Sequence, residues 1–168
     1  ATNATPKADV KDIIQTVRGN CGMNPTHILM SLKVFENLMV VDEIKDYFQY
    51  TAPHVVKPHE VQKQLLGQYL GLEVIVAGAV YNSAAEGASA SLSDIWDDEY
   101  VLIFKRSDGI GDPGIGWTIN WQDDSPGNIN AETYREEQTR STVYRVRHHT
   151  QSNVFAAEFG YLGANVTS

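Results

Sequence analysis

Cysteine is almost missing from this sequence: the one residue, Cys21, excludes an internal disulfide framework and suits a reducing compartment such as the bacterial cytoplasm. Long hydrophobic runs are missing too. The longest, residues 74–81, is far too short to cross a bilayer. No basic segment followed by an apolar run marks a signal peptide. We therefore expect neither a secreted scaffold nor a membrane protein.

Positive charge is scarce. Thirteen lysines and arginines face 21 acidic residues, which gives a net charge of −8 and argues against a dedicated nucleic-acid site. The basic residues that crowd one stretch, Arg135, Arg140, Arg145 and Arg147, are better explained as a solvated strand than as a binding patch. Composition, at 42% hydrophobic and 20% charged residues, is typical of one globular domain.

Catalytic and metal-binding motifs are also missing: we find no G-x-S-x-G, P-loop, H-E-x-x-H or C-x-x-C. Adjacent strand histidines, His148 and His149, would point to opposite faces and could not share a metal. His54 and His59 lack partners at a familiar ligand spacing. The turn at residues 108–114 lacks the ordered oxygen ligands of a calcium loop. We expect no catalytic residue, metal or cofactor.

An acidic cluster around Trp96, at residues 94–99, is the remaining catalytic candidate. Acid–base catalysis needs two carboxylates held apart with separated pKa values, and neighbours in a loop are usually solvated. A hydrolase that uses Asp97, Asp98 and Glu99 therefore stays only as an alternative.

Periodic apolar positions predict an α+β fold, with a central mixed sheet flanked by helices. Thr5 and Pro6 are expected to open a first helix that stops at Gly19, and Ser31 to cap a second. Residues 73–80 predict a central strand covered on both faces. Residues 82–93 predict a small-residue loop and 150–153 a turn. Further helices are predicted at residues 31–39, 42–48 and 58–71, with a loop between Pro53 and Pro58. Further strands are predicted at residues 26–30, 99–105, 115–121, 142–148 and 154–162.

The order of these segments resembles the later part of major capsid proteins of tailed bacteriophages with the Hong Kong 97-type fold. The resemblance rests on Asn24-Pro25 before an apolar strand, a helix leading into Gly71-Leu72 and a second apolar strand, then the small-residue loop, Ile95-Trp96 and a third apolar strand. It covers nearly the whole chain through loose patterns. The N-terminal arm, extended loop and spine helix of that family are not found in the sequence.

This resemblance implies a non-enzymatic subunit of an icosahedral shell, made in the host cytoplasm, that assembles with copies of itself into pentamers and hexamers, with a scaffold or maturation protease as further partners. It implies an axial-domain core at residues 1–130, a partial peripheral-domain arm at 131–152 and a return strand at 153–168. The contacts between subunits would come from loop and arm residues: Asn82, Glu86, Gly87, Asp108, Asp112, Arg135, Glu136, Glu137 and Arg140.

A small carbohydrate-binding module is the alternative from another class. It would use Trp96, Trp117 or Trp121 as a stacking platform. The alternation of Trp117 and Trp121 with Ile115 and Ile119 favours a buried face instead.

Overall fold

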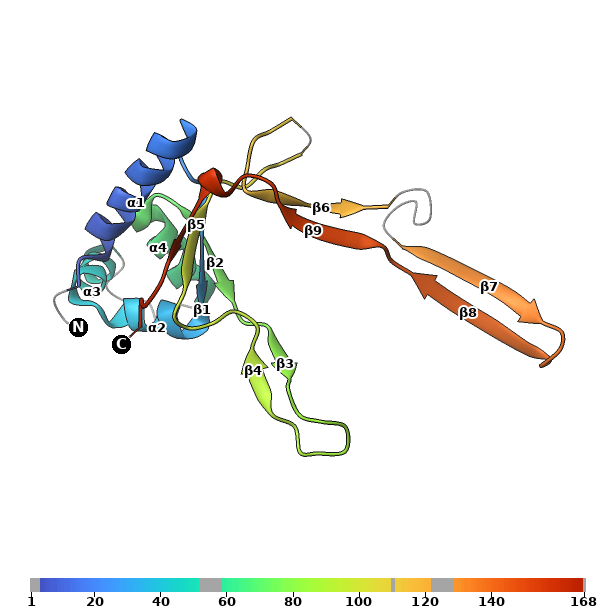
Figure 1. Cartoon of the computed structure of the whole chain (residues 1–168). Helices are drawn as coiled ribbons and strands as arrows, with labels where there is room; N and C mark the ends of the chain where they lie inside the picture. Colours follow the sequence, from blue (N-terminus) through green and yellow to red (C-terminus); the bar gives the residue numbers. More distant parts are fainter. Residues whose placement is uncertain (1–3, 52–58, 110, 122–128, 168) are drawn as a thin grey trace.

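The computed structural model describes residues 4–51, 59–109, 111–121 and 129–167. Its body is a four-stranded mixed sheet in the order β10-β5-β1-β2, in which β1 and β2 are parallel and the other pairs antiparallel. The strands are β1 (His27–Ser31), β2 (Glu73–Ala77), β5 (Val101–Phe104) and β10 (Gly160–Gly163). Figure 1 shows the helices gathered beside this sheet, so the predicted α+β class is confirmed.

The helices of the described residues are α1 (Pro6–Cys21), α2 (Leu32–Val40), α3 (Asp42–Thr51) and α4 (His59–Leu70). Helices α1, α2 and α4 pack on the sheet, and α3 packs against α2 and α4. Their buried side chains, including Phe35, Ile44 and Leu66, join Ile28 and Ile103 of the sheet in one hydrophobic cluster. Burial of this apolar surface is the main stabilising contribution to the body.

The helix ends follow the sequence in part. Ser31 caps α2 as predicted, its hydroxyl accepting a hydrogen bond from Val34 N at 3.2 Å. Thr5 does not cap α1 through its side chain, and α1 runs past Gly19. It ends at Cys21 and is capped by Gly22, whose φ of 74° gives the left-handed conformation that glycine favours.

The apolar segment at residues 73–80 is not a central strand, which corrects the prediction. Strand β2 ends at Ala77 and lies at the sheet edge, with Val74 buried and Ile75 exposed. The central strands are β1 and β5, and β1 is the more completely buried. A short apolar run does not reveal which strand sits in the middle, because pairing order depends on the rest of the chain.

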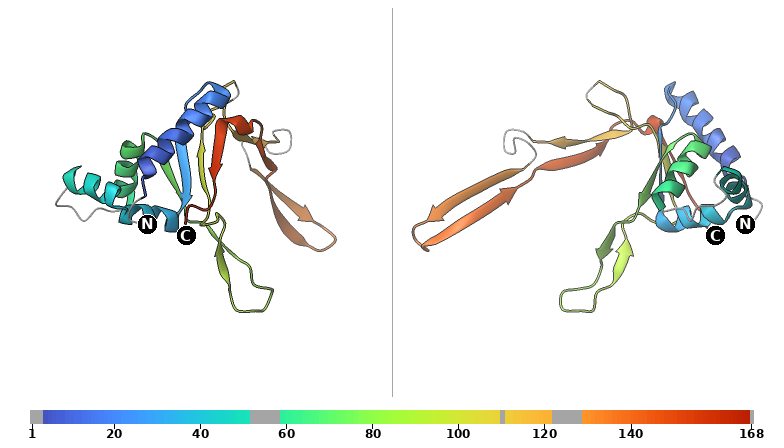
Figure 2. Two further views of the ribbon diagram at one scale, coloured as in Figure 1. Left: turned by 60° about the vertical axis from the view of Figure 1, so that its left-hand side comes forward. Right: turned by 180° about the vertical axis from the view of Figure 1, so that it is seen from behind.

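Two hairpin structures leave the body in different directions (Figures 1 and 2). The shorter pairs β3 (Val80–Asn82) with β4 (Leu92–Asp94), so strands begin and end the stretch predicted as a loop. The longer, which we call the arm, pairs β6 (Gly116–Asn120) with β9 (Thr150–Val154) and then β7 (Asn130–Glu136) with β8 (Ser141–Arg147). The arm thus begins at Gly116. The division at residue 131 stays a prediction.

Two predictions near the C-terminus are wrong. Residues 150–153 form strand β9 instead of a turn. The strand predicted for 154–162 is interrupted by a short 3-10 helix, η1 (Ala157–Phe159), after which β10 pairs with β5. The loop predicted between Pro53 and Pro58, with His54, lies outside the described residues.

Candidate interaction surfaces

The shorter hairpin is closed by a side chain that the sequence marked as a contact residue. Asn82 Oδ1 accepts hydrogen bonds from Ala84 N at 3.1 Å and Ser91 N at 3.0 Å. Glu86 and Gly87 lie beyond it in the exposed tip, where Gly87 has a φ of 83°. Asn82 therefore shapes the loop, and Glu86 and Gly87 present it to the surroundings.

This shorter hairpin carries solvent-exposed apolar side chains. Val80 and Leu92 are 51% and 67% exposed, and the register places them on one face together with Asn82 and Asp94. Ile95, just after β4, is also exposed. Two-stranded hairpins are at best marginally stable alone, and apolar side chains in water offer a surface that a partner could cover.

The proximal part of the arm corrects the prediction of a buried face. Trp117 is half-buried, packs its ring against Phe155 at 5.6 Å between centroids and donates to Ser107 Oγ through Nε1. Ile119 and Trp121, however, are 49% and 65% exposed. The alternating residues form strand β6 as predicted, but this strand belongs to the arm, which extends away from the body (Figure 2).

The distal part of the arm has two unlike faces. Cross-strand pairs place Ala131, Thr133, Arg135, Thr142, Tyr144 and Val146 on one face, and all six residues are exposed. The other face carries Glu132, Tyr134, Arg145 and Arg147, and Glu132 pairs with Arg147. Sequence reasoning did not single out Tyr144 and Val146, although their alternation with arginines was the available signal.

The charged residues predicted at the arm tip are engaged locally. Arg135 pairs with Glu137 at 3.2 Å, and Thr139 donates a hydrogen bond to Glu136 at 3.0 Å. Arg140 occupies the left-handed region with a φ of 50° in the turn that joins β7 to β8. These residues shape the tip and stay exposed, which leaves their role in subunit contacts a prediction.

The root of the arm is held by a compact polar network. Lys105 Nζ donates to Asp112 Oδ1 at 3.0 Å and to the Pro113 carbonyl at 2.7 Å. The backbone N–H of Asp108, followed by Lys105, lowers the pKa of the Asp112 carboxyl below its ordinary value. Asp112 therefore positions the turn from which β6 leaves, whereas the Asp108 side chain is exposed and lies 3.6 Å from Arg106.

Asp98, in the acidic cluster, does not resemble a general acid. Asp98 lies 3.4 Å from Lys33, and the hydroxyl of Ser31 followed by this lysine lowers the pKa of Asp98. A general acid needs the opposite shift. Asp97 Oδ1 accepts a hydrogen bond from Glu99 N, which organises the turn before β5. Within the described part of the chain, no three His, Cys, Asp or Glu side chains are grouped to hold a metal.

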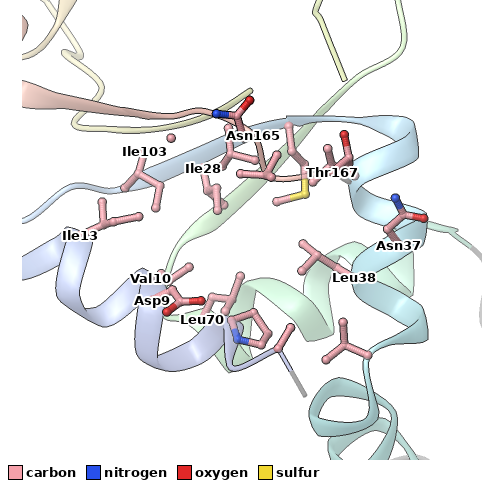
Figure 3. A pocket seen from close by; sticks show the side chains of 18 of the residues that line it. Asp9, Val10, Ile13, Ile28, Asn37, Leu38, Leu70, Ile103, Asn165 and Thr167 are labelled. Atoms are coloured by element: carbon pink, nitrogen blue, oxygen red, sulfur yellow. The ribbon is translucent and has the colours of Figure 1, made fainter. Parts of the chain in front are cut away.

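A crevice of about 640 Å³ opens between the helices and the sheet. In Figure 3, α1 contributes Val10 and Ile13, α2 contributes Leu38, and the segment after β10 contributes Asn165 and Thr167. Most of its walls are core side chains, so we assign it to the packing of the body.

Among the helices that the structure describes, none combines the length and apolar character needed to cross a membrane.

Comparisons with known proteins give one informative result. No protein family and no curated protein matches the sequence. Among solved structures, a phage-related protein from Bordetella bronchiseptica RB50 is similar, with a TM-score of 0.77 and 20% sequence identity. The alignment covers 99% of this chain and 52% of that protein, so the chain spans about half its length. At this identity the likeness shows a shared fold.

Proposed function

We propose that the chain is part of the structural subunit of a bacteriophage capsid and that it has no catalytic activity. The observation that carries the proposal is the fold shared over 99% of the chain with a phage-related protein. The order of segments, which resembles that of Hong Kong 97-type capsid proteins, supports the same proposal.

The shape of the molecule supports a role in assembly. A compact body with two long hairpins offers edges and faces far from its own core (Figure 1). Exposed apolar side chains such as Trp121, Tyr144 and Leu92 lie on those hairpins. Surfaces of this kind mark contacts with other proteins, and head-to-tail contacts around a rotation axis close into rings.

In this proposal the partners are copies of the same protein, arranged as pentamers and hexamers, with a scaffold or a maturation protease during shell formation. The protein is made in the cytoplasm of the bacterial host and ends in the virion. Its net charge of −8 keeps the shell wall from adhering to the packaged DNA.

Electron microscopy and mass photometry of the polypeptide expressed alone test the proposal. We expect rings, tubes or shells whose abundance rises with protein concentration. A solution that contains only monomers at every accessible concentration would contradict it.

A carbohydrate-binding module remains the second candidate, because Trp121 is more exposed than the alternating pattern predicted. Trp96 is less suited, since it is half-buried and donates through Nε1 to the Tyr100 carbonyl at 2.9 Å. Tryptophan fluorescence separates the two functions. Sugars should leave the spectrum unchanged if the capsid proposal holds, and a saturable shift that Trp121→Ala removes would favour the binding module.

A further inference from the structure

The direction of the arm is set where the arm leaves the body. Between β5 and β6 the chain makes a turn that brings Gly114 against Ser107, and a Cβ added at Gly114 would lie 2.6 Å from Ser107 N. Across the root of the arm, a Cβ added at Gly160 would lie 2.5 Å from Ile115 Cδ1. Neither contact leaves room for a side chain at the glycine. The turn, the residue before β6 and the start of β10 are therefore packed closely together.

Lys105, the residue after β5, joins the body to this turn through its side chain and its backbone. The side chain is 15% exposed, and Nζ donates to Asp112 Oδ1 at 3.0 Å, to Asp112 Oδ2 at 3.2 Å and to the Pro113 carbonyl at 2.7 Å. The backbone N–H of Lys105 donates to the Phe159 carbonyl at 2.9 Å, and its carbonyl accepts from Ile115 N at 3.1 Å. Removing one partner of a largely buried ion pair is costly, so these contacts resist opening.

Ser107 extends the connection to the first strand of the arm. Its hydroxyl donates to the Asp112 carbonyl at 2.7 Å and accepts a hydrogen bond from Trp117 Nε1. The Trp117 ring packs against the ring of Phe155. Continuous contacts therefore run from Lys105 at the end of β5, through Asp112 and Ser107, to an indole on β6.

A small rotation at this root becomes a large displacement at the tip of the arm. Strands β6 and β7 follow one another along the arm and contain five and seven residues (Figure 1). At about 3.3 Å per residue they extend the arm by about 40 Å, so a swing of about 10° would move the tip by about 7 Å. Contacts between proteins need complementary surfaces, which a displacement of this size would separate.

We infer that Lys105, Asp112, Ser107 and Trp117 form a lock that fixes the direction of the arm relative to the body. The lock consists of contacts within one molecule, and its effect on assembly rests on the proposed function. With the lock closed, every copy presents its arm at one angle, and head-to-tail contacts repeated at one angle close into uniform rings. With the lock open, the arm swings and the rings lose their uniform size.

Spin-label distances test the lock in the single molecule. In a Cys21→Ser background, one label at Lys11→Cys on α1 is paired with a second label on the arm. The second label is placed either at Thr150→Cys in β9, near the root, or at Gln138→Cys in the tip, and all three labelled sites are exposed. Double electron–electron resonance gives the distribution of distances, measured below the concentration at which oligomers form.

Two variants open the lock at different points. Lys105→Met removes the ammonium and keeps an unbranched side chain, and Ser107→Ala removes the hydroxyl that links the turn to Trp117. For a swing of about 10°, each should broaden the distribution by about 3 Å at Thr150 and about 7 Å at Gln138, because both labels move about the root. Broadening at Gln138 alone would place the flexible point within the arm, and unchanged distributions would show that the root has no lock. Either result overturns the inference.

A second ion pair of the body provides the matched control. Lys33→Met removes a lysine that lies 3.4 Å from Asp98 and should leave both distributions unchanged. Circular dichroism shows whether each variant is folded, and Ser107→Ala still tests the lock if Lys105→Met does not fold. Equal broadening in Lys33→Met would show a general loosening of the protein and would contradict the lock.

Electron microscopy of the same variants tests the consequence for assembly. Where the unaltered protein forms rings of one size, Lys105→Met and Ser107→Ala should form a wider range of sizes, and Lys33→Met should not. If the unaltered protein does not assemble, the capsid proposal fails while the label distances still decide the lock. If variants with broadened distances assemble as uniformly as the unaltered protein, the lock stands and its role in assembly is wrong.

Discussion

Tyr69→Phe should remove a bond that joins two helices while it leaves the ring packing in place. The hydroxyl of Tyr69 on α4 donates to Glu43 Oε1 on α3 at 2.6 Å. The ring centroids of Tyr69 and Tyr47 lie 4.6 Å apart, and Lys7 Nζ of α1 lies 4.3 Å from the centroid of the Tyr69 ring. A hydrogen bond to a half-buried carboxylate contributes about 1–2 kcal/mol. For a chain of this size, the melting temperature should fall by about 3–6 °C.

The pH dependence of this loss provides the sharper test. Burial, followed by the hydrogen bond and charge of Glu43, raises the pKa of Tyr69 from 10.0 to about 12. The folded protein therefore keeps the tyrosine proton at a pH where the unfolded chain has lost it. The contribution of the protonated Tyr69 hydroxyl to the free energy of unfolding is complete below pH 10 and declines as the pH rises toward 12.

Urea unfolding of both proteins between pH 8 and 11 measures this decline. By pH 11 the advantage of the unaltered protein over Tyr69→Phe should have fallen by about 1 kcal/mol, after allowance for partial solvent screening. Tyr50→Phe, at an exposed position in α3, is the control and should change neither the stability nor its pH profile. A difference that stays constant from pH 8 to 11 would refute the assignment of the raised pKa to Tyr69.

Three further changes test the body and the arm. Phe35→Ala leaves a cavity at a fully buried site and should lower the free energy of unfolding in urea by about 3–5 kcal/mol. The control Val40→Ala, at an exposed position, should lower it by less than about 0.5 kcal/mol, and similar losses for both would contradict this core. Ser31→Ala removes the α2 cap and should cost about 1–2 kcal/mol by the same assay; no loss would mean that the cap is not formed. Gly116→Ala would place its Cβ 2.3 Å from the Asn153 carbonyl oxygen. Hydrogen exchange should then show faster exchange in β6 and β9 with an unchanged body, and equal protection would refute this close pairing.

The sequence predicts the body better than the arm, because the body depends on local patterns. The stripe of Val10, Ile13, Ile14 and Val17 forms one helix face, and Val17 is fully buried. The cap at Ser31 is local as well. The edge position of β2 was missed because an apolar segment has the same composition whichever strands flank it, and only long-range pairing with β1 fixes its place.

The candidate residues were predicted to make contacts between subunits, which stays a prediction, and the structure adds what several of them do within the chain. Asn82 Oδ1 and Asp112 Oδ2 accept hydrogen bonds from backbone N–H groups of their own turns, and Asp112 also accepts from Lys105, so both residues shape those turns. Glu86 and Gly87 lie at a tip. Tyr144 and Val146 were missed, because strand alternation identifies a face without showing whether the rest of the chain covers it.

The exposure of Trp121, which was predicted to be buried, bears on function. Alternating Ile119 and Trp121 are typical of a strand that packs on an apolar layer, yet both side chains stay largely exposed among the residues that the structure describes. Only Trp117, at the root, reaches Phe155 and Ser107. If the proposed assembly forms, a second molecule would cover these exposed apolar side chains. The arm would then be ordered fully on assembly, and hydrogen exchange in β6 should slow when oligomers form. Unchanged exchange at Ile119 and Trp121 in the assembled state would show that the pattern has no such partner.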